Sequence, residues 1–253
     1  WQYFASVAFP PEEQVRRSWD VAPAWFGRVP SANCEVRLVE AFREADMPFA
    51  FYNQPTEDGS RPGVYYVNGF DLDRKPKHQL ASTTYHEANP GHHFQVALEQ
   101  EMDGRPAIRR FGGFLAGSAF TEGWGLYSER LADEMGLYED ESERLGMLDL
   151  QGMRAARLVV DTGIHALGWT RERAIATLED AGLPTVEATI ETDRYITMPG
   201  QALSYKIGQF EIERQRTAAA EREGAEFSLR AFHDRLLALG SLPLTALRRE
   251  LAR

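Results

Sequence analysis

The stretch TYHEANPGHHFQ, residues 84–95, contains three of the six histidines in the chain. Glu87 follows His86 directly, and His92 and His93 follow a Pro-Gly pair. Many zinc hydrolases carry His-Glu-x-x-His on one helix, where two imidazoles bind the ion and the glutamate reaches the attacking water. Here the second histidine comes two or three residues later. The segment is therefore either a metal site with an insertion or a histidine-rich start of a helix.

In a straight helix neither later histidine lies where a second ligand belongs. That ligand usually lies four residues after the first, about 40° around the helix and about 6 Å along it. His92 follows His86 by six residues and lies about 240° around the helix, on the opposite side. His93 follows by seven and lies about 10.5 Å along the axis, too far for two imidazoles to share an ion.

Pro90 and Gly91 change this expectation. Pro90 has no N–H to donate to the carbonyl of His86, and it disfavours helical angles at the residue before it. Gly91 tolerates almost any backbone angle. We therefore expect the helix to break between Glu87 and Gly91, which would bring His92 to the place of the second ligand. The alternative, capping and surface hydrogen bonds by chance histidines, stays open at this point.

A candidate third ligand occurs about thirty residues later, in FTEGWGLYSERL at 120–131. Glu122 lies between Phe120 and Trp124 on an expected helix, and a carboxylate in apolar surroundings is costly unless it is paired or bound to a cation. Glu129 is a second candidate, but its neighbour Arg130 favours a solvated residue. We therefore prefer Glu122, for which an exposed acid at a helix start is the alternative.

Two later segments carry further polar candidates. Asp161 and His165 are four residues apart and share a helix face, as an acid that orients a catalytic histidine would. Tyr195 and Tyr205 could each donate an O–H to an oxyanion, and Arg194 could bind a carboxylate. The alternatives are a buried pair that satisfies itself and tyrosines that fill a core.

The composition of the whole chain excludes several classes of protein. Its 253 residues suffice for one large domain or two small ones. A formal net charge of −10 with scattered basic residues argues against nucleic acid as a partner. No apolar run approaches the ~20 residues of a membrane span. The single cysteine, Cys34, excludes an internal disulfide and a cysteine-based zinc site, and its surroundings indicate a core residue.

The chain begins WQYFASVAFP, with neither a Met nor a signal segment. We interpret it as a fragment of a longer protein, which leaves the location open between the cytoplasm and a secreted or lipoprotein state. The oligomeric state is also open.

The order of predicted elements indicates a mainly α fold. One or two broken helices are expected within residues 1–33, and three β-like runs follow at 34–42, 49–55 and 63–70. We expect a small antiparallel sheet, whose last run could pair with an extended substrate at its edge. Thr170 and Thr185 are expected to cap helices. Helices are predicted at about 77–88, 90–102, 117–136, 142–168, 171–182, 186–198, 201–223, 228–239 and 243–252.

Several segments together resemble a known family. YHEANPGHHFQ, EGWGLYSERL, RLVVDTGIHALGW and YITMPGQALSYKIGQ occur in this order, after FREADMPFAFYNQP and SRPGVYYVN. In this combination they resemble the C-terminal half of the bacterial family called domain of unknown function 885, over nearly the whole chain. Members are typically longer than this chain, and some resemble secreted lipoproteins.

The resemblance implies a zinc metallopeptidase related to mostly helical oligopeptidases that carry a His-Glu-x-Gly-His helix and a downstream glutamate. By position it implies His86 and His92 as zinc ligands, Glu87 as general base and Glu122 as third ligand. The unusual spacing leaves the choice between His92 and His93 open. It also implies a helical metallopeptidase-like body that forms one catalytic domain over residues 1–253.

The leading hypothesis is zinc-dependent hydrolysis of a peptide or a related small amide. Zinc would polarise the carbonyl and lower the pKa of its water toward ~7, and Glu87 would accept the proton. His165 and Tyr205 are expected to stabilise the oxyanion, and His93, Arg194 and Tyr195 to contact the substrate. One alternative is a metal- or peptide-binding protein without catalysis, against which the presence of Glu87 argues. Another is a helical scaffold without metal.

Overall fold

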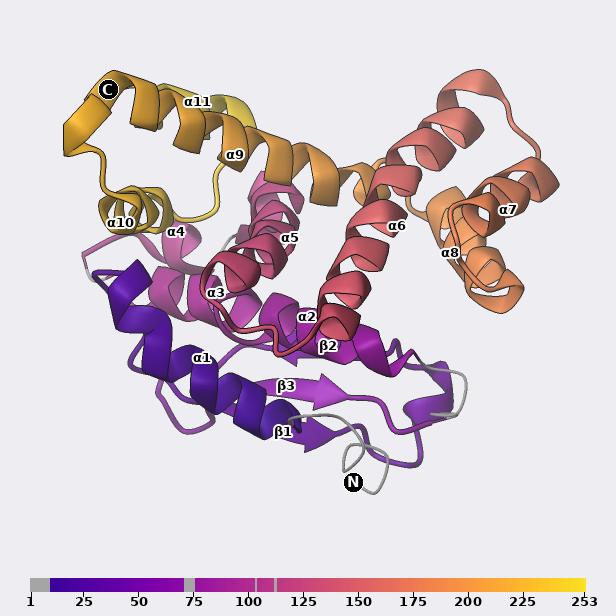
Figure 1. Ribbon diagram of the computed structural model, residues 1–253, viewed down its shortest axis with the longest axis horizontal. Coiled ribbons are helices and arrows are strands. Elements are labelled where there is room, and N and C mark those ends of the chain that lie inside the picture. Colours follow the sequence, from indigo (N-terminus) through magenta and orange to yellow (C-terminus); the bar gives the residue numbers. More distant parts are fainter. Residues whose placement is uncertain (1–9, 71–75, 103, 112) are drawn as a thin grey trace.

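The computed structural model describes residues 10–70, 76–102, 104–111 and 113–253, and most of them are helical. Figure 1 shows a small sheet on one side of the molecule, with helices stacked over it and a helical arm that extends away. The expected mainly α fold is confirmed. The expected broken helices before residue 34 resolve into one helix, α1 (Pro11–Trp25), while residues 1–9 lie outside the described residues.

The helical body follows the predicted order, with some shifts at the ends. The expected helix at about 77–88 is a single turn, Lys77–Gln79, followed by α2 (Leu80–Glu87). A short helix, α4 (Ala107–Phe111), was not predicted. The remaining helices are α3 (His92–Gln100), α5 (Ala119–Glu134), α6 (Glu141–Leu167), α7 (Arg171–Asp180), α8 (Thr185–Thr197), α9 (Ser204–Glu223), α10 (Leu229–Leu239) and α11 (Leu244–Leu251).

The two expected threonine caps differ in outcome. The side chain of Thr170 accepts a hydrogen bond from the backbone N–H of Arg173, so it caps α7 as predicted. The prediction for Thr185 was wrong, because Pro184 occupies the cap position of α8. The Thr185 hydroxyl instead donates to Glu179 Oε1 at 2.5 Å.

The sheet contains the three predicted strands, β1 (Cys34–Leu38), β2 (Ala50–Asn53) and β3 (Gly63–Val67). Their order is β1-β3-β2, with β3 parallel to β1 and antiparallel to β2. The expected purely antiparallel sheet was therefore wrong, because the chain places β3 between the two earlier strands. Since β3 is paired on both sides, the expectation that it offers an edge to a substrate was also wrong.

Three apolar clusters hold these elements together. The largest joins α1, α2, α3, α5, α9, α10 and α11, with Phe94, Trp124 and Phe232 among its buried side chains. A second, around Tyr65, joins α1 and α2 to the sheet. A third lies between α6, α7 and α8, around Tyr195. The arm in Figure 1 therefore has a core of its own.

Helices α5 and α9 cross at very close range. A Cβ atom on Gly123 would lie 2.4 Å from the Cα of Gly208, and one on Gly208 would lie 1.9 Å from the carbonyl oxygen of Ala119. Only glycine at both positions allows this approach. Because α5 carries Glu122 and α9 carries Tyr205, the crossing sets the distance between these two candidate residues.

Candidate metal centre

The histidine segment contains the predicted helix break. Helix α2 ends at Glu87 and α3 begins at His92. Between them Ala88 and Gly91 have non-helical ψ angles of −114° and −129°, and the Asn89–Pro90 peptide bond is cis. The two helices therefore form a bent pair in which both histidines lie close to the bend.

Helix α5 holds the bend in place. The indole Nε1–H of Trp124 donates to the carbonyl oxygens of Pro90 at 2.9 Å and Gly91 at 3.2 Å, and the Ser128 hydroxyl donates to the former at 3.2 Å. These bonds tie the bend to α5, and the Gly91 carbonyl also accepts from the backbone N–H of Gln95 at 3.1 Å. A Cβ atom on Gly91 would lie 1.9 Å from the carbonyl oxygen of His86, so the bend requires glycine there.

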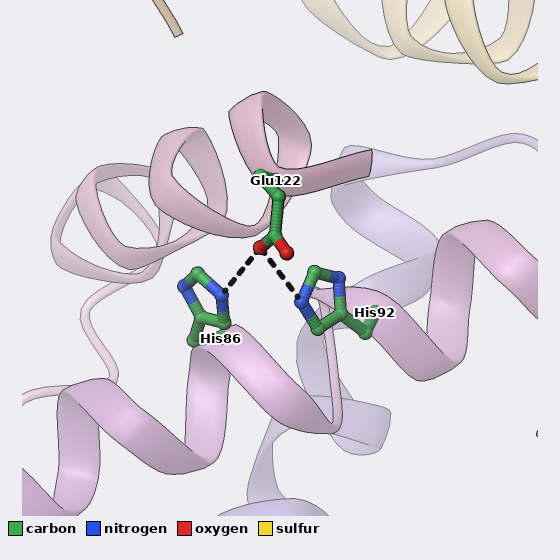
Figure 2. A group of neighbouring side chains, drawn as sticks. All are labelled: His86, His92 and Glu122. Atoms are coloured by element: carbon green, nitrogen blue, oxygen red, sulfur yellow. Dashed lines mark ion pairs between the residues drawn. The ribbon is translucent and has the colours of Figure 1, made fainter. Parts of the chain in front are cut away.

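His86, His92 and Glu122 converge at this bend, from α2, α3 and α5 (Figure 2). Glu122 Oε2 lies 3.7 Å from His86 Nε2 and 3.5 Å from His92 Nε2. One ligand atom from each of the three residues lies within 4.8 Å of the other two. The structure thus brings together the three residues that the sequence predicted as metal ligands.

Gly125 makes the space in which the imidazoles meet. A Cβ atom at this position would lie 2.7 Å from Cε1 and Nε2 of His86 and 3.0 Å from Cε1 of His92. Gly125 lies three residues after Glu122 on the same helix face. The same face of α5 therefore supplies the carboxylate and clears the volume beside it.

Glu129 orients His86 from behind. Its Oε1 lies 2.7 Å from His86 Nδ1, which leaves Nε2 to face Glu122. Oε2 accepts hydrogen bonds from Ser82 at 3.1 Å and Gln151 at 3.4 Å, and the Glu129 side chain is fully buried. Carboxylates that hold the second nitrogen of a metal-binding histidine are typical of metal sites.

The interpretation of Glu129 as a solvated residue was therefore wrong. Its spacing of seven residues from Glu122 places it on the same helix face, and this spacing was given too little weight against the adjacent arginine. Its neighbour Arg130 is exposed. His92 differs from His86, because its Nδ1 has no hydrogen-bond partner among the described residues.

The electrostatics of the cluster agree with a site built for positive charge. Burial acts to lower the pKa of His86, but its interactions with the carboxylates of Glu122 and Glu129 outweigh burial and raise the pKa to about 9. Burial acts to raise the pKa of Glu122, but both histidines hold it below its ordinary value. The pKa of Glu129 is also lowered against the effect of burial, first by the charge of Arg154 and then by His86. Two carboxylates at this depth are thus stabilised by cations around them.

His93 is a structural residue here. Its Nε2 donates to the carbonyl oxygen of Ala32 at 2.9 Å, and its Nδ1 accepts from the hydroxyl of Tyr52, also at 2.9 Å. The ring is fully buried, and burial lowers its pKa to about 4. Both nitrogens are used, so the expected role of His93 in substrate binding was wrong. Of the two histidines left open as the second metal ligand, the structure places His92 in the cluster and His93 outside it.

Glu87 is partly buried at the end of α2, directly after His86. It makes no hydrogen bond or ion pair with the residues that the structure describes. Its charge acts on the pKa of His86 and on that of Tyr65 in β3. Glu87 therefore carries a carboxylate beside the cluster that no other described side chain engages.

Tyr205 lies against the cluster, as expected. Its ring centroid is 6.2 Å from that of His86, with an interplanar angle of 26°. Its hydroxyl lies 3.5 Å from Arg194 Nη2. Arg194 also pairs with Glu191 at 3.1 Å.

The structure does not bring His165 or Tyr195 to the cluster. His165 is exposed near the end of α6, where its Nε2 donates to the carbonyl oxygen of Tyr195 at 2.9 Å, and that end lies well away from α2 in Figure 1. Asp161 accepts from the backbone N–H of Gly200 at 3.0 Å rather than from His165. Tyr195 is buried and donates to Glu191 at 2.7 Å. The predicted roles of His165 and Tyr195 were wrong because both serve the arm formed by α6, α7 and α8.

A sizeable cavity lies at a different place from the cluster. It has a volume of about 840 Å³ and is lined by residues that include Arg28, Asn33, Arg61, Gln100 and Arg110. None of the converging ligands lines it. We place the candidate site at the cluster, because ligand chemistry rather than volume identifies a metal centre.

Comparisons with known proteins agree with the sequence motifs. The family model described as bacterial protein of unknown function (DUF885) matches residues 11–251. No curated protein matches the chain. The crystal structure of the "putative lipoprotein from Colwellia psychrerythraea" is 39% identical with a TM-score of 0.91, over 96% of this chain and 41% of that one.

A second solved structure shows the same fold at greater distance. A "putative lipoprotein of unknown function from Shewanella oneidensis" is 24% identical with a TM-score of 0.77, over 99% of this chain and 46% of that one. This chain therefore spans less than half the length of either structure. From the match over residues 11–251, the chain belongs to the DUF885 family of bacterial proteins.

Proposed function

We propose that the protein is a zinc-dependent hydrolase that cleaves peptide or related amide bonds. The observation that carries the proposal is the convergence of two imidazole nitrogens and one carboxylate oxygen within 4.8 Å, from three different helices. Catalytic zinc sites typically have three such ligands and an open fourth position.

The donor set fits zinc in its details. Zinc takes histidine nitrogen and carboxylate oxygen as ligands. The hydrogen bond between Glu129 and Nδ1 of His86 fixes the tautomer that leaves Nε2 for the ion. Gly125 keeps the space between His86 and His92 free of a side chain. Glu87 adds a feature that a purely structural site does not need.

The chemistry then follows from the residues around the cluster. A bound zinc would polarise the scissile carbonyl and lower the pKa of water to about 7. Glu87 would accept the proton of the attacking water and deliver it to the leaving nitrogen, which restores its own carboxylate. Tyr205 is the candidate O–H donor to the oxygen that gains negative charge.

The test combines metal analysis with one variant. Glu87→Gln should retain one zinc per chain and reduce hydrolysis of a responsive peptide by ~10²–10⁴-fold, as expected for loss of a general base. Glu221→Gln, an exposed residue of α9, is the matched control and should leave turnover unchanged. Loss of zinc in Glu87→Gln would make Glu87 a ligand instead. Zinc without hydrolysis of any peptide by the unaltered protein would favour a binding protein.

The proposal extends to the location of the protein. No helix in the described residues combines the length and apolar character that crossing a membrane demands. Both related structures carry the description "putative lipoprotein". This description supports a secreted or lipid-anchored state for the protein that contains this chain. Fractionation of cells that express the full-length protein tests this, and recovery only from the cytoplasm would contradict it.

A further inference from the structure

Three arginines gather around Tyr205, on the side of the metal centre formed by α6 and α8. The guanidinium carbon of Arg157 lies 4.6 Å from the Tyr205 ring centroid, and that of Arg154 lies 5.9 Å from it. Arg194 Nη2 lies 3.5 Å from the Tyr205 hydroxyl. Since Tyr205 also stacks on His86, a single side chain connects this arginine group to the candidate metal ligands.

The hydrogen bonds of Arg157 are incomplete. Its Nε donates to Tyr195 at 2.9 Å and its Nη2 donates to Glu191 at 2.7 Å. Its Nη1 has no acceptor among the described residues, and water cannot easily replace one because only 5% of the side chain is exposed. Nε of Arg154 is also buried and has no acceptor among the described residues. A buried N–H of a charged group without an acceptor is costly, so an acceptor from outside the chain would stabilise it.

The local charges also leave a positive excess. Glu191 pairs with both Arg157 and Arg194. Glu129 lies 3.7 Å from Arg154 but also holds His86 at 2.7 Å. Three guanidinium groups therefore share two carboxylates, one of which is already engaged by the metal-binding histidine. An anion at this place would balance the remaining charge.

We infer that Arg157, with Arg154 beside it, binds a carboxylate of the substrate next to the metal centre. This inference rests on the proposed function. The Nη1 group of Arg157, which has no acceptor among the described residues, can donate a charge-assisted hydrogen bond to a carboxylate oxygen. The carboxylate could be the free C-terminus of a peptide or an acidic side chain, and the experiment distinguishes these two sources.

The primary test measures binding rather than turnover. The probes are 2-benzylsuccinate and its half amide, which keeps one carboxylate for the metal and replaces the other with a neutral group of similar shape. Calorimetric titration of the zinc-loaded protein should show about tenfold or greater preference for the dicarboxylate, as expected for one charge-assisted hydrogen bond. Arg157→Met should abolish this preference and retain zinc.

Two further variants serve as control and safeguard. Arg144→Met removes an exposed arginine from the same helix and should keep the preference, since Arg144 pairs only with Asp133 and Glu141 among the described residues. If Arg157→Met leaves Glu191 with Arg194 as its only ion-pair partner and does not fold, the double variant Arg157→Met/Glu191→Gln removes both partners of the Arg157–Glu191 pair. This double variant should bind 2-benzylsuccinate and its half amide equally.

The outcomes separate this inference from the proposed function. Absence of zinc after loading would refute the metal centre itself. With zinc present, equal affinity for the two probes, no binding of either, or a preference that survives Arg157→Met would overturn the carboxylate site. Competition by peptides with a free or amidated C-terminus, and with Glu or Gln side chains, then identifies which carboxylate Arg157 recognises.

Discussion

At the scale of single residues, Gly125 shows how tightly the candidate centre is packed. His86 and His92 have ring centroids 4.6 Å apart at an angle of 83°, and Gly125 lies against both. Any side chain at position 125 would have to displace one imidazole. Space for a metal in this chain thus depends on glycine at position 125 as much as on the ligands.

We expect Gly125→Ala to weaken zinc binding by about tenfold or more while the chain still folds, because disturbing the groups that orient metal ligands typically costs about 10–100-fold in affinity. Competition with a chelator of known affinity measures this. Gly152→Ala is the matched control, since a Cβ atom there meets nothing within 4 Å. Equal zinc affinity in Gly125→Ala and the unaltered chain would show that His86 and His92 do not bind one ion.

Sequence reasoning at this scale selected His86 and His92 from the helix break between them, and Glu122 from its apolar neighbours. It could not decide between His92 and His93, because the partners that fix His93 are Ala32 and Tyr52, far away in the chain. The error on Glu129 has another origin. An adjacent arginine was taken as a sign of solvent, although neighbours on a helix point in different directions.

At the scale of elements, the site depends on how α5 crosses its neighbours. The indole of Trp124 fixes the bend between α2 and α3, and Gly123 lets α9 approach on the other side. Helix α5 thereby positions Glu122 against the histidines and Tyr205 against His86. The bend itself was predictable from Pro90 and Gly91, whereas the crossing was not, because small residues alone do not specify a partner.

Gly208→Ala should destabilise the fold by about 1–3 kcal/mol, because the added methyl group would press on the Ala119 carbonyl and force α5 and α9 apart. Chemical denaturation measures the free energy of unfolding. Gly152→Ala should instead leave it unchanged or raise it by about 0.5–1 kcal/mol through helix propensity. A neutral Gly208→Ala would mean that the two helices are not in contact as described.

The sheet shows why strand order escaped prediction. Alternating and aromatic residues marked the starts of the three strands to within one residue, but the predicted runs extended two to four residues beyond their ends. Their pairing depends on the connections, and the segment from Val39 to Phe49 carries β2 beyond the place that β3 later fills. Local patterns fix which residues are extended, while long-range contacts fix which strands are neighbours.

At the scale of the whole molecule, His233 ties three parts of the main core together. Its Nδ1 donates to the carbonyl oxygen of Trp25 at 3.0 Å, and its Nε2 accepts from the hydroxyl of Tyr127 at 2.8 Å. It thereby joins α10 to the end of α1 and to α5. The ring is fully buried, and burial lowers its pKa from 6.5 to about 4.

This shift has a definite consequence for stability. The unfolded chain binds a proton at His233 below about pH 6.5, while the folded chain resists it until about pH 4. The stabilisation is therefore fully present above pH 6.5 and is lost as the pH falls toward 4, on the order of 3 kcal/mol in total. Denaturation at pH 7 and pH 5 should show a smaller loss of stability in His233→Asn than in the unaltered chain. An equal loss in both would contradict the buried neutral state.

The separate core of α6, α7 and α8 explains why His165 and Tyr195 were misplaced. Sequence patterns correctly placed both on helices, but they carry no information on how far α6 projects from the rest of the body (Figure 1). Arg157 and Tyr205 lie where that arm meets the body, and this junction contains the arginine group described above.

The most direct test of the metal centre is anomalous diffraction at the zinc edge from crystals of the zinc-loaded protein. We expect one strong peak per chain, bound by Nε2 of His86, Nε2 of His92 and the carboxylate of Glu122, with zinc–nitrogen distances of ~2.0–2.1 Å. Zinc bound elsewhere in a folded chain, or no zinc at these three residues, would contradict the account.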